Sequence, residues 1–99
     1  MGTKYKQTPL EAEKQRRICV AVWAYAYEYL SASIVSDAKF DAVCREIDLT
    51  QATDNAVMDI WFCENFNPST GSWVGKHPHQ KRLHELACRQ LDGLGVYYE

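Results

Sequence analysis

The hydrophobic and polar positions of the chain follow a helical period from the first predicted helix onward. Thr8-Pro9-Leu10-Glu11 predicts a helix start, because Thr8 can cap the helix, Pro9 suits its first position and Glu11 completes a capping box. No helix-breaking residue follows before about Ala32, so we expect one long helix over roughly 9–32. Residues 1–7 are expected to form a flexible tail.

This long helix changes character midway. Residues 11–17 are mostly charged, whereas residues 18–30 are apolar on nearly every face. A helix that is apolar all round either lies at the centre of a fold or faces a partner. We therefore expect the long helix to be the spine of the domain, and residues 18–30 are a candidate homodimer interface.

A second helix is expected over 37–47. Ser36 can cap it, and its apolar positions recur at helical spacing. These positions are Phe40, Val43, Cys44 and Ile47.

A third helix is expected over 53–65. Its core face is expected at Val57 with Ile60 or Trp61, and Glu64 is expected to face outward.

A fourth helix is expected to open at Pro78 and to end at Gly93 and Gly95. Before it lies an ordered loop over 67–77 that contains Trp73. The following residues, 96–98, are expected to fold back onto the core. The expected buried side of the fourth helix is Leu83, Leu86, Ala87, Gln90 and Leu91.

The pattern contains no convincing alternation of a β-strand. We therefore predict an all-α fold: residues 1–99 form one small four-helix domain made of two helical hairpins, with the long first helix as spine.

Composition narrows the class of protein. The 99 residues are 46% hydrophobic and 24% charged with a net charge of −2, which excludes a disordered chain and disfavours a strongly basic nucleic-acid binder. A nucleic-acid contact through Lys14, Arg16 and Arg17 with the tail lysines Lys4 and Lys6 is the weakest candidate. The chain starts without an apolar leader, and the apolar run over 18–27 is too short for a membrane span. We expect a cytoplasmic protein that does not enter a membrane.

Acidic residues gather in the middle of the chain, where residues 41–65 carry six acidic side chains and one basic one. This band is either a solvated face or a surface for a basic protein partner. The candidate contact residues are Asp48, Asp54, Asp59 and Glu64. Trp73 either fills the core or serves as an exposed anchor for that partner.

Catalytic and metal signatures are weak. The cysteines Cys19, Cys44, Cys63 and Cys88 form no CxxC pair, and we expect free thiols. His77 and His79 are expected to be exposed at a helix start. His84 and Cys88 share a helical face, but no motif of Cys–His catalysis surrounds them. The segment 71–77 lacks the glycine spacing of a phosphate loop. We expect no metal, no cofactor and no enzymatic activity.

Residues 27–41 read Tyr-Glu-Tyr-Leu-Ser-Ala-Ser-Ile-Val-Ser-Asp-Ala-Lys-Phe-Asp. This segment, within roughly 18–47, resembles the N-terminal Ia subdomain of bacterial NAD-dependent DNA ligases. That subdomain is a helical hairpin that grips the nicotinamide mononucleotide half of NAD. The resemblance implies that Tyr27, Asp37, Phe40 and Asp41 line a nucleotide site; Phe40 stands for a tyrosine of the family, and Glu28 replaces its histidine. The nucleophilic-lysine motif is missing, so we do not expect the chain to ligate DNA alone.

Residues 66–78, Phe-Asn-Pro-Ser-Thr-Gly-Ser-Trp-Val-Gly-Lys-His-Pro, resemble a loop of small phage proteins, which implies a phage or prophage origin. We therefore expect a non-enzymatic, phage-type protein–protein interaction module that acts as an accessory factor or as an inhibitor of a host system such as a defence system. The alternative is a small module that binds nicotinamide mononucleotide or NAD through the ligase-like hairpin.

Overall fold

The long first helix forms the axis of the molecule. The computed structural model describes residues 8–95, so the expected tail over 1–7 and the expected fold-back of 96–98 lie outside the described residues. The described elements are α1 (Pro9–Tyr29), α2 (Asp37–Glu46), α3 (Ala56–Asn65), the 3₁₀ helix η1 (Ser72–Lys76) and α4 (Gln80–Leu94). Residues 8–95 contain no β-strand, and the predicted all-α fold with four helices is confirmed.

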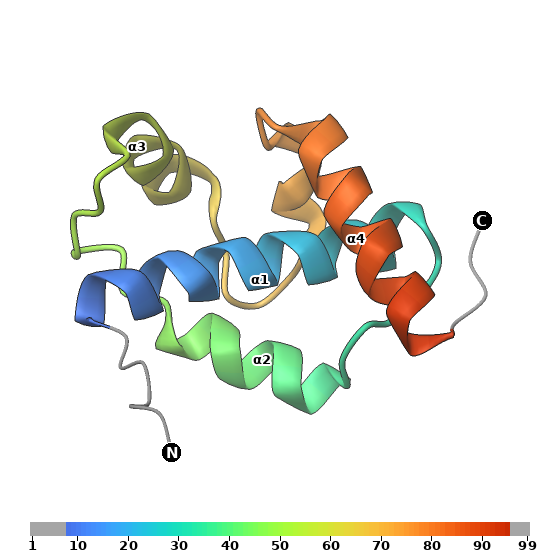
Figure 1. Cartoon of the computed structure of the whole chain (residues 1–99). Helices are drawn as coiled ribbons and strands as arrows, with labels where there is room; N and C mark the ends of the chain where they lie inside the picture. Colours follow the sequence, from blue (N-terminus) through green and yellow to red (C-terminus); the bar gives the residue numbers. More distant parts are fainter. Residues whose placement is uncertain (1–7, 96–99) are drawn as a thin grey trace, which may run out of the picture.

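Helix α1 packs against α2, η1 and α4. Figure 1 shows α2 antiparallel to α1 along one side, α3 on the other side, and α4 crossing the C-terminal end of α1. This central position explains why residues 18–30 are apolar on nearly every face, since six of them are buried by other parts of the same chain. The buried ones are Val20, Ala21, Val22, Ala24, Ala26 and Leu30; the large exposed ones are Ile18, Tyr27 and Tyr29.

Both ends of α1 have identifiable caps. The predicted capping box is present, with the Glu11 N–H donating to Thr8 Oγ1 over 3.1 Å and the Thr8 N–H donating to Glu11 Oε1 over 2.9 Å. The helix ends at Tyr29, a few residues before the expected end near residue 32. Ser31 has a left-handed φ of 53°, and the Ala32 N–H donates back to the Ala26 carbonyl over 3.2 Å. The left-handed residue and this return hydrogen bond end the helix without a proline or glycine signal in the sequence.

Helices α2 and α4 agree with the predicted patterns in their main features. Ser36 caps α2, whose Val43 and Cys44 are buried. In α4, Leu83, Ala87 and Leu91 are buried, and Gly95 caps the helix with a φ of 70°.

Two details of α4 were predicted incorrectly. The helix begins at Gln80, two residues beyond Pro78. Gln90 is exposed, because the buried stripe is centred on Ala87 and Leu91 and Gln90 falls at its edge.

The buried face of α3 also differs from the prediction. The helix begins at Ala56, later than expected, because Asn55 caps it by accepting a hydrogen bond from the Met58 N–H. Phe62 is the buried residue of α3, Trp61 is half-buried, and Val57 and Ile60 are 73% and 60% exposed.

Candidate functional site

A pocket opens where the α1–α2 hairpin meets the loop over 69–71, with a volume of about 330 Å³. The four residues that the ligase resemblance singled out, Tyr27, Asp37, Phe40 and Asp41, all line this pocket. Tyr27 is 63% exposed and Phe40 is half-buried, so both rings remain accessible from the pocket.

Local structure explains how the pocket residues converge. The Ser36 cap fixes the start of α2, so Asp37 lies in its first turn and Phe40 and Asp41 lie one turn further. Tyr27 belongs to the last turn of α1.

The third wall is the loop, which approaches α1 closely at Gly71. A side-chain carbon at Gly71 would lie 3.2 Å from Cβ of Ala24 and 3.7 Å from Cζ of Phe40. Sequence reasoning did not assign this loop or Trp23 to the site. The turn residues of 67–71 marked a loop, but nothing in the sequence placed it against the hairpin.

Charge in the pocket has one sign. Its lining includes the carboxylates of Glu28, Asp37 and Asp41 and, within the described part of the chain, no lysine or arginine. The lining also includes three aromatic residues, Trp23, Tyr27 and Phe40. Aromatic faces and carboxylates both attract cations, so the pocket suits a cationic ligand with a flat ring.

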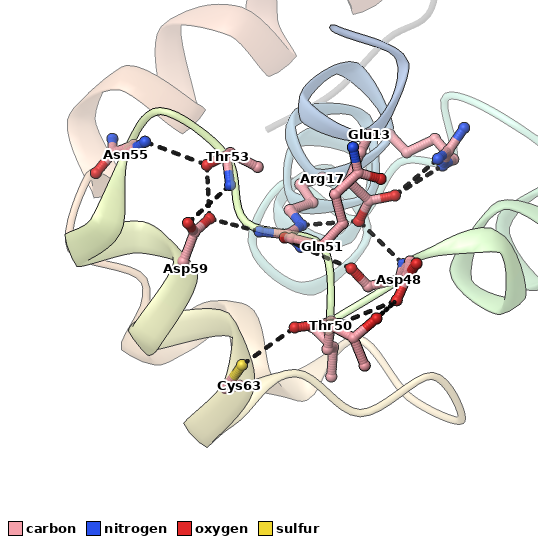
Figure 2. A network of polar contacts seen from close by, with 11 residues as sticks. Glu13, Arg17, Asp48, Thr50, Gln51, Thr53, Asn55, Asp59 and Cys63 are labelled. Carbon is pink, nitrogen blue, oxygen red and sulfur yellow. Dashed lines mark hydrogen bonds and ion pairs between the residues drawn. The ribbon is translucent and has the colours of Figure 1, made fainter. Parts of the chain in front are cut away.

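Two side chains of the acidic band, Asp48 and Asp59, have partners within the chain (Figure 2). Asp59 accepts hydrogen bonds from the backbone and hydroxyl of Thr53 and pairs with Arg17. The Thr53 hydroxyl is the main cause that lowers the pKa of Asp59. Asp48 accepts from the hydroxyl and N–H of Thr50, which lowers the pKa of Asp48.

The two other acidic candidates are more open. Asp54 forms an ion pair with Lys14 at 2.9 Å, and Glu64 is exposed as predicted. The structure therefore leaves Glu64 and part of Asp54 at the surface, whereas Asp59 is largely committed to the fold.

Arg17 and Glu13 form the buried centre of this polar network. Arg17 Nε lies 2.8 Å from Glu13 Oε2, and Arg17 Nη2 donates to the carbonyls of Asp48 and Gln51 at 2.8 and 3.0 Å. Glu13 also accepts from the Asp48 N–H. Within residues 8–95 every buried side-chain nitrogen and oxygen has a partner, so the network is complete.

The basic residues of α1 that were candidates for a nucleic-acid contact pair with acidic side chains of the chain itself. Arg17 is buried, Arg16 pairs with Glu13, and Lys14 pairs with Asp54. Lys4 and Lys6 lie outside the described residues.

Trp73 belongs to the core, and the hypothesis of an exposed anchor is wrong. Its side chain is 5% exposed, and its Nε1 donates to the Thr70 carbonyl over 2.7 Å. Its ring packs against Trp61, Phe62 and Phe66, with centroids 5.1–6.0 Å apart.

His77 is also buried, contrary to the expectation that it is exposed at a helix start. It lies against Trp61 and Phe62, and its Nδ1 accepts from the His79 N–H over 3.0 Å. Burial, with a smaller contribution from His79, lowers the pKa of His77 to about 4. His79 is exposed, as predicted.

The part of the chain that the structure describes holds no group of three or more His, Cys, Asp or Glu side chains placed to bind a metal ion. Over the same residues no helix is both long and apolar enough to cross a membrane.

The hairpin pocket therefore brings the four residues of the ligase-like segment together around an accessible cavity. Comparison of the chain with models of protein families, with curated proteins and with solved structures finds no match.

Proposed function

We propose that the chain is a non-catalytic binding module whose ligand is a small molecule with a positively charged aromatic ring, of the pyridinium type found in nicotinamide nucleosides. One observation carries the proposal: Tyr27 and Phe40 line a pocket of about 330 Å³ that also holds three carboxylates. The resemblance of residues 27–41 to the nicotinamide-binding hairpin of bacterial DNA ligases supports the same ligand class.

The charge of the pocket favours a nucleoside over a nucleotide. A pyridinium ring between Tyr27 and Phe40 gains from aromatic stacking and from cation–π attraction. Asp37 and Asp41 can accept hydrogen bonds from ribose hydroxyls. A phosphate would instead face Glu28, Asp37 and Asp41 with no basic side chain among the described lining residues. Nicotinamide riboside is therefore expected to bind more tightly than the mononucleotide.

Titration of the full chain with nicotinamide riboside, nicotinamide mononucleotide and neutral nicotinamide tests this proposal. Calorimetry gives the affinities, and quenching of tryptophan fluorescence reports contact with Trp23. We expect the affinity order riboside, mononucleotide, nicotinamide, and weaker riboside binding at high salt.

Variants assign the binding to the pocket. Asp37→Asn and Phe40→Leu are each expected to weaken riboside binding about tenfold, since one charge-assisted or aromatic contact contributes about 1.4 kcal/mol. Asp54→Asn removes an exposed carboxylate outside the pocket and serves as the matched control. The proposal fails if the riboside does not bind, or if Asp54→Asn weakens binding as much as Asp37→Asn.

A phage-type interaction module, acting as accessory factor or inhibitor of a host system, is the second candidate function. Val57 and Ile60 support it, because they lie three residues apart on α3 and are both well exposed. Glu64 continues the same side of α3 and is also exposed. A purified partner is expected to lose affinity for the Val57→Ser/Ile60→Ser variant and to keep its affinity for Glu85→Gln on α4. Equal binding to both variants would reject α3 as the contact surface.

A further inference from the structure

A cysteine, a histidine and a tyrosine form a series of contacts between α4 and α1. Cys88 Sγ lies 3.5 Å from Nε2 of His84. On the other side of the imidazole, His84 Nδ1 lies 3.1 Å from Oη of Tyr25. The Tyr25 and His84 rings also meet edge to face, with centroids 5.7 Å apart. A nucleophile, a base and a group that orients the base are thus in contact.

One tautomer of His84 makes both contacts with Nε2 as the acceptor for the Cys88 S–H. We assign the proton to Nδ1, where the Nδ1–H donates to the Tyr25 oxygen. Nε2 then carries the free lone pair and accepts the S–H of Cys88. In this arrangement the thiol proton is hydrogen-bonded to a base, as activation of a nucleophilic cysteine requires.

The three other thiols have different surroundings. Cys63 is more exposed than Cys88, but its S–H donates to the Leu49 carbonyl, a bond that only the neutral thiol can make. Cys19 accepts from the Gln15 amide. Cys44 is buried, and burial raises the pKa of its thiol to about 11. Cys88, by contrast, contacts a basic nitrogen, Nε2 of His84.

We propose that Cys88 is a modification site that reacts with low-molecular-weight disulfides by thiol–disulfide exchange, with His84 as the base. Nε2 of His84 takes the S–H proton, and the sulfur of Cys88 attacks one sulfur of the disulfide. The Cys88–sulfur bond forms as the disulfide bond of the reagent breaks. The released thiolate takes the proton from His84, so one disulfide is exchanged for another without an external oxidant.

The surroundings of the pair keep the neighbouring tyrosine neutral. Burial, with smaller contributions from Cys88 and Tyr29, raises the pKa of Tyr25. From α1, Tyr25 contacts the pair and the Tyr29 ring lies beside Tyr25. On α4, Glu85 and Asp92 lie one turn to either side of Cys88.

The test uses oxidised glutathione as the probe on the folded full chain, with peptide mapping by mass spectrometry to give a rate for each cysteine. We expect Cys88 to be glutathionylated first at pH 7, ahead of the more exposed Cys63. His84→Gln is expected to slow Cys88 about tenfold and to leave the rate at Cys63 unchanged.

The pH dependence of the Cys88 reaction rate distinguishes catalysis by His84 as a base from a change in the accessibility of Cys88. In the unmodified chain the Cys88 rate is expected to depend less steeply on pH than the Cys63 rate, because His84 takes the thiol proton. In His84→Gln it is expected to fall with pH in parallel with Cys63. Because His84 is exposed, this variant is expected to keep its melting temperature.

Tyr25→Phe is a second variant that removes the partner of Nδ1 and retains the ring. It is expected to slow Cys88 by a smaller factor, about two- to fivefold, because it acts through His84. The proposal is overturned if Cys63 reacts first, or if His84→Gln leaves the pH profile of Cys88 unchanged.

Discussion

Asp59 Oδ1 lies 2.8 Å from Nη1 of Arg17, joining α3 to the buried polar centre of α1. Arg17 also lies over the ring of Phe62, with its guanidinium carbon 5.6 Å from the ring centroid. Asp59 and Phe62 are three residues apart and share a helix face. The ion pair therefore turns this face of α3 toward α1, and Val57 and Ile60 are left exposed.

The first prediction concerns Arg17. Arg17→Ala is expected to lower the free energy of unfolding by about 3–5 kcal/mol, because it removes the partner of a buried carboxylate and of two backbone carbonyls. Urea denaturation measures this. Arg16→Ala is the matched control, with an expected loss below about 1 kcal/mol, since Arg16 is partly exposed. Equal losses in the two variants would contradict a central role for Arg17.

The second prediction tests the orientation of α3. Phe62→Ala is expected to cost about 3–5 kcal/mol of stability, as for other buried aromatic residues. Val57→Ser and Ile60→Ser are expected to change stability by less than about 0.5 kcal/mol each, because both side chains are exposed. Thermal or urea unfolding of the three variants decides the matter. A large loss in Val57→Ser would mean that α3 is rotated relative to this structure.

The third prediction is a pH dependence caused by His77. Its pKa is about 4 in the fold against an ordinary value of 6.5, so the unfolded chain binds a proton more readily. The stabilising effect of the neutral imidazole is complete above about pH 6.5 and is lost as the pH falls toward 4. The melting temperature is expected to fall over this window. His77→Asn keeps an acceptor for the His79 N–H and removes the titration.

A smaller fall of the melting temperature between pH 6.5 and 4 in His77→Asn therefore supports a buried neutral His77. The same fall in the variant as in the unmodified chain would contradict it. The lowered pKa values of Asp48 and Asp59 cause a separate loss of stability that is concentrated at lower pH, as the pH falls through their ordinary value of 3.8.

The fourth prediction concerns the end of α1. Ser31 has a φ of 53°, which glycine adopts without strain. Ser31→Gly is expected to raise the free energy of unfolding by about 0.5–1 kcal/mol. Ser33 is a nearby exposed serine without a positive φ, and Ser33→Gly is expected to be neutral or slightly destabilising. Thermal unfolding of both variants checks the difference, and stabilisation by Ser33→Gly alone would contradict the explanation.

Local sequence signals predicted the helices well. The capping box at Thr8 and Glu11, the Ser36 cap and the Gly95 cap depend on contacts within a few residues, so the sequence alone indicates them. The ligase resemblance likewise gave four residues that lie on neighbouring turns of one hairpin, and all four line the same pocket.

Contacts between distant segments could not be predicted in this way. The loop at Gly71 reaches the hairpin across more than thirty residues of sequence, and the approach of Tyr25 to His84 spans 59 residues. Trp73 had two reasonable interpretations, and only its packing against Phe62 and Phe66 decided between them.

The sequence by itself determined the all-α class, the central place of the apolar first helix and the hairpin that carries the pocket, because short-range hydrogen bonds and helical periodicity specify them. The tertiary structure decided which charges are available. Within the acidic band Asp59 is committed to the fold, because the buried Arg17 needs partners from distant segments, whereas Glu64 stays exposed. Burial and long-range pairing depend on the position of every element at once, so no local pattern specifies them.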